Sequence, residues 1–150
     1  DNRSTPISEY DDMIEMADLV EGVLTDDINQ IKAGAEQLGR DINNQIPGFP
    51  SNLLHLAISM GTERMVEVVL DLPYVEINWV MANRGVTPLM TACLMGNFNT
   101  VRMLHQRGAN LFLKNNRGEN CLNITACRIA SVDQPERFET IKAYLVQEMA

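Results

Sequence analysis

The sequence predicts an all-α fold made of short paired helices that recur along the chain. The clearest pair lies within residues 85–110. Thr87 is a good N-cap, because its hydroxyl can accept a hydrogen bond from a free backbone N–H of the first turn. Pro88 suits the first helical position, where its missing N–H costs nothing. Gly96 is placed to end this helix, and a second amphipathic helix follows and ends at Gly108.

The same pattern recurs before and after this pair at a nearly constant spacing. Gly85 and Gly118 are 33 residues apart, and the candidate N-caps Asn52 and Thr87 are 35 residues apart. Apolar residues in the helices recur at i, i+3 and i+4, which gives each helix one apolar face. Caps and apolar faces that recur at one period indicate tandem helix-turn-helix units, each of which buries its face only against its neighbours.

The run from Gly85 to Asn110 resembles an ankyrin repeat, whose signature is G-x-T-P-L-H-x-A, then a glycine, a V-x-x-L helix and G-A-D-x-N. The matching positions are Gly85, Thr87, Pro88, Leu89, Ala92, Gly96, Val101, Leu104, Gly108 and Ala109. Met90 replaces the usual histidine, and Asn110 replaces the usual aspartate.

The resemblance implies a single domain over residues 1–150 with about four units, of which the first and last are degenerate. Their approximate bounds are 10–43, 44–78, 79–111 and 112–150. The implied fold class is an all-α solenoid with β-hairpin-like fingers that project from the helices. In this family, partners usually bind on the concave face that the fingers and the first helices form.

The first unit lacks the T-P-L-H box, so we expect it to act as an N-terminal cap. We expect residues 1–9 to be a polar lead-in and a helix to begin near Tyr10, with interruptions at Gly22 and Thr25. A second helix should follow and end at Gly39. Its apolar stripe is Ile28, Ile31, Ala35 and Leu38.

The fourth unit departs from the signature in its second half. Thr125 stands where alanine is usual, the helix-ending glycine is missing, and residues 129–134 are extra. We expect Pro135 to open the last helix. The inner face of that helix should consist of Phe138, Ile141, Tyr144 and Leu145.

Charge is distributed unevenly along the chain. Residues 1–45 hold 11 acidic and 3 basic side chains, whereas residues 46–150 hold 9 of each. The absence of a basic stripe argues against nucleic acid as a partner, since phosphate binding requires one. End units of a stack need a polar outer face, which accounts for the acidic start.

We expect an intracellular protein, in the cytoplasm or nucleus. No run of apolar residues is long enough to cross a membrane, and no signal peptide is visible. Cys93, Cys121 and Cys127 have neither disulfide nor zinc spacing, so we expect reduced, buried thiols on helices. The sequence starts without a methionine and stops within a helical pattern, which suggests a fragment of a longer protein.

Nothing in the sequence predicts an enzyme, a metal site or a cofactor. No G-x-S-x-G, HExxH, P-loop or paired Cys/His motif is present. His55 occupies the histidine place of the T-P-L-H box and is expected to be structural, and His105 lies on the other type of helix. Adjacent acids such as Asp26 and Asp27 are better explained by helix capping.

The resemblance places a partner-binding surface on the fingers and on the exposed ends of the first helices. The finger residues are Ile46, Phe49, Met81, Asn83, Arg84, Lys114, Asn116 and Arg117, and the helix residues are Met60, Leu94, Met95 and Arg128. Val86 and Glu119 occupy further finger positions, and Ser59 and Cys127 further exposed positions of the first helices. Ile46 and Phe49 look exposed. Flexible methionines favour contact with apolar side chains, so we expect a groove for a protein or peptide with apolar anchors and acidic flanks.

Two alternatives remain open at this point. The domain could supply a self-association contact to a larger protein and form a homo-oligomer, because the ends of a short stack leave apolar surface exposed. It could also be an ankyrin-type inhibitor of a kinase or of a transcription factor, which its length and number of units would allow. Neither membrane nor nucleic acid is an expected partner.

Overall fold

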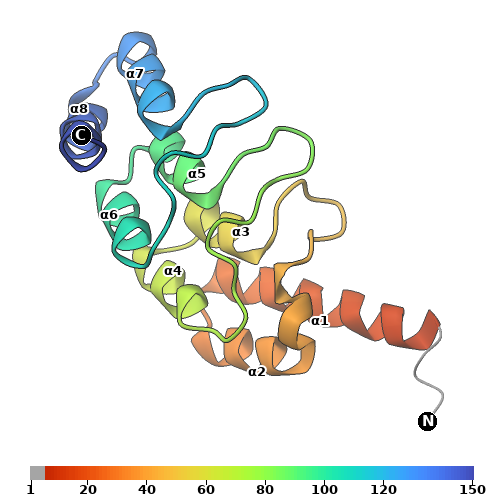
Figure 1. Ribbon diagram of the computed structural model, residues 1–150. Helices are drawn as coiled ribbons and strands as arrows, with labels where there is room; N and C mark the ends of the chain where they lie inside the picture. Colours follow the sequence, from red (N-terminus) through yellow and green to blue (C-terminus); the bar gives the residue numbers. More distant parts are fainter. Residues whose placement is uncertain (1–5) are drawn as a thin grey trace. The chain divides into compact units, whose positions relative to one another are not determined.

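The computed structural model describes the backbone of residues 6–150 and the side chains of residues 16–150. These residues form eight α-helices and one 3₁₀ helix, with no strand among them. The elements are α1 (Pro6–Thr25), α2 (Ile28–Leu38), η1 (Gly39–Asn43), α3 (Leu53–Met60), α4 (Glu63–Leu70), α5 (Pro88–Met95), α6 (Phe98–Gln106), α7 (Cys121–Ser131) and α8 (Glu136–Glu148) (Figure 1). The chain divides into two compact units, one up to Val75 and one from Glu76.

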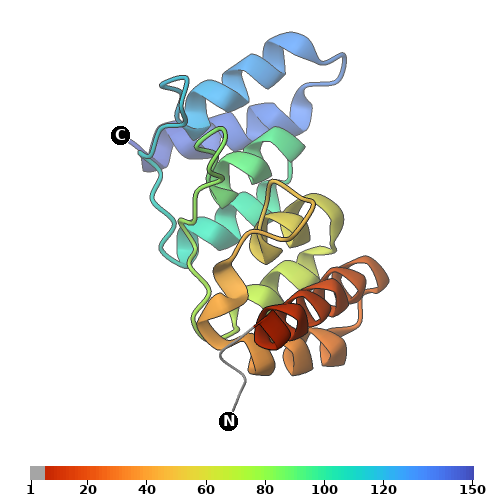
Figure 2. The ribbon, with the colours of Figure 1, turned by 90° about the vertical axis from the view of Figure 1, so that its right-hand side faces the viewer.

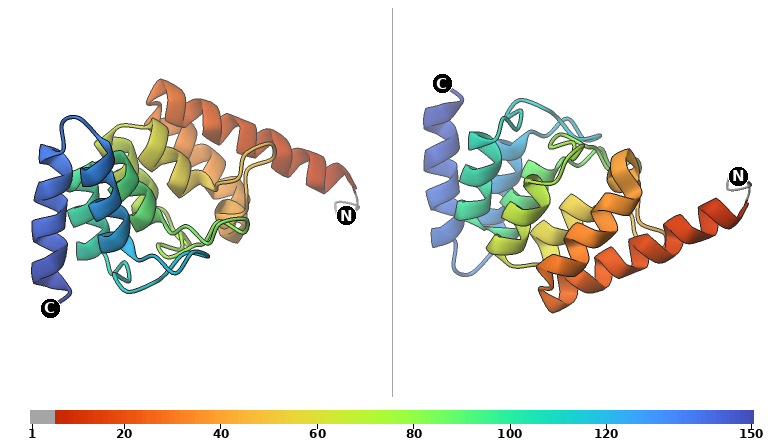
Figure 3. Two further views of the ribbon diagram at one scale, coloured as in Figure 1. Left: turned by 90° about the horizontal axis from the view of Figure 1, so that it is seen from above. Right: turned by 90° about the horizontal axis from the view of Figure 1, so that it is seen from below.

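In the first unit, α1 and α2 run antiparallel, side by side (Figure 3). The sequence predicted a break at Gly22, and this prediction was wrong, because α1 continues to Thr25. A β-carbon at position 22 would lie 2.9 Å from Cδ1 of Ile31, so Gly22 allows α2 to approach closely without breaking α1. The helix also starts earlier than predicted, at Pro6, and the lead-in over residues 1–5 lies outside the described part.

The turn between α1 and α2 depends on two aspartates. Asp26 has a left-handed backbone with φ of 58°, which ends α1. Asp27 then caps α2, since its carboxylate accepts a hydrogen bond from the backbone N–H of Gln30 at 3.1 Å. The predicted stripe of α2 is confirmed at Ile31, Ala35 and Leu38, which are buried in the core.

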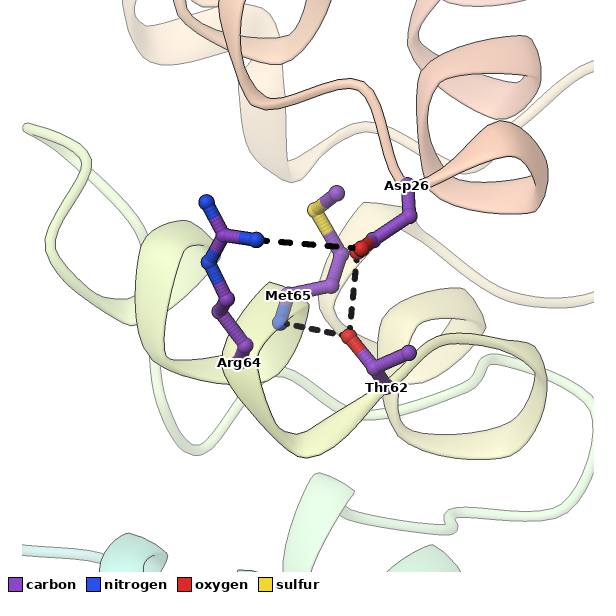
Figure 4. Close-up of polar contacts among 4 residues, drawn as sticks. All are labelled: Asp26, Thr62, Arg64 and Met65. Carbon is purple, nitrogen blue, oxygen red and sulfur yellow. Dashed lines mark hydrogen bonds and ion pairs between the residues drawn. The ribbon is translucent and has the colours of Figure 1, made fainter.

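One aspartate also links this turn to the next repeat (Figure 4). The hydroxyl of Thr62 donates a hydrogen bond to the carboxylate of Asp26 at 3.1 Å and accepts one from the backbone N–H of Met65 at 3.1 Å. Arg64 lies 4.0 Å from the same carboxylate. The N-cap of α4 therefore holds the end of α1 as well as its own helix.

The second unit begins with the helix pair that the sequence predicted most clearly. The hydroxyl of Thr87 accepts a hydrogen bond from the backbone N–H of Met90 at 3.3 Å, which caps α5. Gly96 ends α5 in the left-handed conformation, with φ of 73°. Asn97 caps α6 in the same way, by accepting from the backbone N–H of Thr100 at 3.2 Å.

The unusual fourth repeat is a long helix pair, α7 and α8, whose members lie side by side (Figure 2). Thr125 is tolerated at the usual alanine position because its hydroxyl donates to the backbone oxygen of Cys121 at 2.8 Å. No glycine stops α7, which therefore extends to Ser131. Phe138, Ile141 and Leu145 of α8 are buried, as predicted.

Tyr144, the fourth predicted inner residue of α8, is half-buried and contacts α6. Its hydroxyl lies 2.6 Å from Nδ1 of His105, and its ring packs edge-to-face on Phe98 with centroids 5.5 Å apart. Burial and the nearby charge of Glu148 raise the pKa of Tyr144, so its hydroxyl keeps its proton. This contact fastens α8 to α6.

The prediction from residue type that all three cysteines are buried was wrong for Cys127, whereas its repeat position, which predicted exposure, is confirmed. Cys93 and Cys121 are fully buried, whereas Cys127 is exposed on α7. The thiol of Cys121 donates to the backbone oxygen of Leu111 at 3.3 Å. Hydrogen bonding with Cys121 and burial raise the pKa of Cys93 well above its usual value.

The packing around Gly96 predicts the effect of adding one methyl group there. A β-carbon would lie 2.7 Å from Cζ of Phe138, which is fully buried, and 2.7 Å from Nε of Arg137. We expect Gly96→Ala to lower the free energy of unfolding by about 2–4 kcal/mol, because overpacking adds to the strain of a left-handed alanine. Urea denaturation followed by circular dichroism measures this loss.

Gly108→Ala is the matched control. Gly108 has φ of 96°, but a β-carbon added there would have no described neighbour within 4 Å. The free energy of unfolding of Gly108→Ala should therefore fall by only about 1–2 kcal/mol, from backbone strain alone. Equal losses for the two variants would contradict the packing that we describe.

The environments of the cysteines predict their order of alkylation. Because the thiolate is the reactive form and needs access to the reagent, iodoacetamide should modify Cys127 first in the native protein. Cys93 and Cys121 should react at least about a hundredfold more slowly, since they must wait for local opening of the helices. Mass spectrometry of timed samples measures these rates, with Cys127→Ser as the control that removes the fast phase. Rapid labelling of Cys93 would contradict the burial that we report.

Candidate functional site

The second finger (residues 79–84) forms a tight hairpin-like turn. The backbone N–H of Met81 donates to the oxygen of Val86 at 3.0 Å, and the N–H of Gly85 donates to the oxygen of Met81 at 2.7 Å. Gly85 has φ of 72°, and a β-carbon there would lie 2.5 Å from the side-chain oxygen of Asn116. Only glycine allows this turn and this close approach of the next finger.

The third finger (residues 111–117) and the two residues after it are organised by the side chain of Asn115. Its Oδ1 accepts hydrogen bonds from the backbone N–H of Arg117 at 2.9 Å and of Glu119 at 3.0 Å. Its backbone N–H donates to the oxygen of Glu119 at 2.9 Å, which closes the turn. Side-chain bonds of this kind are the reason that asparagine favours turns.

The second and third fingers are joined by Asn116. Its backbone N–H donates to the oxygen of Arg84 at 3.0 Å, and its side-chain amide donates to the oxygen of Asn83 at 3.3 Å. Asn116 was predicted to bind a partner, and the structure uses part of its side chain to hold the two fingers in register. The side chains on these fingers are therefore presented from a fixed base.

A groove with a volume of about 510 Å³ lies between the two fingers and helices α5 and α7. Its lining consists of Asn83, Arg84, Val86, Leu94, Asn115, Asn116, Arg117, Glu119 and Ile124. Val86 and Ile124 are buried, and Leu94 is 42% exposed, so the three make an apolar floor. Amide and charged side chains from the two fingers form its rim.

The rim carries two cations that are available for a ligand. Arg84 and Arg117 are both exposed, and within residues 16–150 neither has a carboxylate at ion-pair distance. The carboxylate of Glu119 also lines the groove and accepts from the side-chain amide of Asn115 at 3.1 Å, so the lining holds two cations and one anion. The groove therefore combines an apolar floor with a positively charged edge.

The structure brings together five of the predicted partner-binding residues in this groove. They are Asn83, Arg84, Leu94, Asn116 and Arg117. Met95 is exposed beside the groove on α5, at 43%, and Lys114 is exposed on the third finger, but neither lines the groove, and Met81 is half-buried. Arg128 points elsewhere, with its guanidinium 5.2 Å from the ring centre of Phe138.

The three remaining predicted residues belong to the first unit. Met60 is 61% exposed at the end of α3. Phe49 is 42% exposed, as expected, but the expectation that Ile46 is exposed was wrong, because only 2% of it is accessible. The finger folds Ile46 inward through hydrogen bonds between its own backbone groups and those of Ser51 and Phe49, at 2.9 Å each. Ile46 and Phe49 line a smaller cavity of about 290 Å³.

Val86 and Glu119 of the groove stand at predicted finger positions, whereas sequence reasoning missed its two other residues, Asn115 and Ile124. Asn115 looks like an ordinary turn residue, although two adjacent asparagines, 115 and 116, indicate a turn that side-chain hydrogen bonds to the backbone stabilise. Ile124 lies 33 residues after Thr91, so the repeat period places it on the same side of α7 as Thr91 on α5. The prediction considered only the ends of the first helices and therefore passed over it.

Other classes of site find little support in the described side chains. Within residues 16–150, no group of three or more His, Cys, Asp or Glu side chains could hold a metal ion. No described helix is both long and apolar enough for a membrane span. A polar cavity of about 590 Å³ at the α1–α2 turn is lined by Asp26 and Asp27 as well as Lys32 and Arg64, so its charges are mixed.

Comparison with known proteins agrees with the geometry. The family model described as ankyrin repeats, in three copies, matches residues 23–115 of the chain. No curated protein matches the sequence significantly. The match covers more than half of the chain and includes the helix pairs α3–α4 and α5–α6 with their caps. The chain therefore belongs to the ankyrin-repeat family.

Proposed function

We propose that the second unit binds an extended segment of a partner protein in the groove between the second and third fingers. Ankyrin repeats are generally protein–protein interaction modules. The observation that carries the proposal is that one groove contains both the exposed Leu94 and two arginines, Arg84 and Arg117. Neither arginine forms an ion pair within residues 16–150. Arginines, and side chains of the partner that fill a well-packed apolar pocket, carry much of the binding energy in interfaces.

The groove selects the chemistry of the segment. An aliphatic or aromatic side chain would bury its surface on Leu94, Val86 and Ile124. Carboxylates placed beside that anchor would pair with Arg84 and Arg117, whose planar guanidinium groups bind carboxylates through two hydrogen bonds. The partner is therefore a protein or peptide with one or two apolar anchors and acidic flanks.

The hydrogen bonds within the fingers favour binding without large rearrangement. Asn115 and Asn116 already fix both turns, so little backbone entropy remains to be lost when a segment enters. The side-chain amides of the rim can also bond to an extended backbone. Such a site provides specificity through the position of its anchor and its charges.

We propose a binding role for this protein and not a catalytic one. His55 is a core residue of α3 with 2% exposure, and His105 lies against Tyr144 on the side of α6 that faces α8. Neither histidine lines the groove. Free thiols suit a reducing compartment, so we propose the cytoplasm or the nucleus as its location.

Two substitutions test this proposal. We expect Leu94→Glu and Arg84→Glu each to weaken binding at least about tenfold, because one removes the apolar floor and the other repels the acidic flank. The ligands are peptides selected from a displayed random library on the wild-type protein, and affinity is measured by isothermal titration calorimetry. Their sequences should combine an apolar residue with nearby Asp or Glu.

Matched controls lie on α8, outside the groove. Val146→Glu places the same charge on an aliphatic residue that is 50% exposed, and Lys142→Glu reverses an exposed cation. Both should bind the peptides as wild type does. If the folded groove variants bind as tightly as the wild-type protein, the groove is not the binding site. Sedimentation of the unliganded protein separately tests the self-association alternative.

A further inference from the structure

A second cleft lies in the first unit, between α1 and the first finger (residues 44–50). Its volume is about 290 Å³, and the described residues that line it are apolar: Ala17 and Val20 from α1, and Ile46, Pro47 and Phe49 from the finger. We call it the first-finger cleft. Ile46 is buried at its base, whereas Phe49 stands at its edge with 42% of its surface exposed.

The first finger is held in one conformation by its own hydrogen bonds. The backbone N–H of Phe49 donates to the oxygen of Ile46 at 2.9 Å, and the side-chain amide of Gln45 donates to the oxygen of Phe49 at 2.9 Å. Pro47 and the left-handed Gly48, with φ of 83°, fix the turn between them. The exposed ring of Phe49 is thus presented on a preformed wall, which lowers the entropy lost on binding.

The apolar surface continues from the cleft along α1. Ala17, Val20 and Leu24 follow one another at three- and four-residue spacing, so they share one side of the helix. Leu24 is 55% exposed. An exposed apolar strip that joins an apolar cleft is typical of an interaction surface.

The charge beside this strip has the opposite sign to that of the groove in the second unit. Asp18 and Glu21 occupy the neighbouring side of α1 and both are exposed, and among the described side chains no cation lines the first-finger cleft. Residues 1–75 carry 14 acidic and 4 basic side chains. A net negative charge attracts cations and increases the rate at which basic partners associate.

We propose that the first-finger cleft binds a second kind of partner segment, with an apolar anchor flanked by lysine or arginine. The anchor packs between Phe49 and Val20 above Ile46, and the basic flanks lie along the acidic side of α1. This site does not depend on the Arg84 groove, which takes acidic flanks. The domain therefore has two docking sites that select opposite charges.

A pair of matched peptides tests this inference. One carries a phenylalanine and a leucine between lysine pairs, and its twin carries glutamates in place of the lysines. Fluorescence anisotropy with the whole chain should show that the lysine peptide binds at least about tenfold more weakly to Phe49→Ser than to wild type. Asp18→Lys should weaken binding of the lysine peptide about threefold or more, and the affinity of the wild-type protein for this peptide should fall as salt is added.

Two controls separate the cleft from the groove and from general charge. Phe112→Ser removes a more exposed ring, at 61%, from the third finger, and Glu36→Lys makes the same charge change on α2. Both variants should bind the lysine peptide as wild type does. Phe49→Ser should leave the glutamate peptide unaffected, whether or not the Arg84 groove binds it, so failure of one site does not imply failure of the other.

Three results would overturn the inference. They are equal binding of the lysine peptide by folded Phe49→Ser and wild type, equal loss of affinity in Glu36→Lys and Asp18→Lys, and wild-type self-association that Phe49→Ser abolishes. The last result would assign the cleft to a second copy of the chain instead of a basic segment. Circular dichroism confirms folding of each variant.

Discussion

An isolated α-helix of eight or nine residues is not stable in water, and this constraint governs both units of the protein. Helices α3, α4 and α5 have eight residues each, and α6 has nine. Their stability must come from side-chain caps at their first turns and from burial of one face against the next helix. Asn52, Thr62, Thr87 and Asn97 supply these caps, and the core residues of the repeats supply the burial. The fingers are the loops that connect one short helix pair to the next.

The sequence revealed the repeats because their local chemistry is explicit. The caps at Asn52, Thr87 and Asn97 and the left-handed Gly96 follow directly from residue type and spacing. The errors arose where tertiary packing overrode local preference. Gly22 suggested a break, but its missing side chain serves the approach of Ile31. The expectation that Cys127 is buried rested on residue type, whereas its repeat position placed it among the exposed residues of the first helices.

The candidate site was predictable in part, for a related reason. The repeat register identified Arg84, Leu94 and Arg117, whose positions follow from the finger and the first helix. It failed at Ile46, because a finger with two prolines and a glycine folds that side chain inward. Ile124 was passed over because the prediction considered only the ends of the first helices. Arg128 fits the register but packs on Phe138 in place of the groove. Repeat position thus predicts where a residue sits, while its neighbours decide which way its side chain points.

The central claim is that the groove of the second unit receives a segment with an apolar anchor and acidic flanks. Amide chemical-shift mapping with a library-selected peptide on ¹⁵N-labelled protein measures this most directly. The account predicts that the largest changes fall in the second and third fingers, around Leu94 and at the start of α7, together with the side-chain signals of Arg84 and Arg117. Changes concentrated on α6 and α8, with the groove unperturbed, would contradict it.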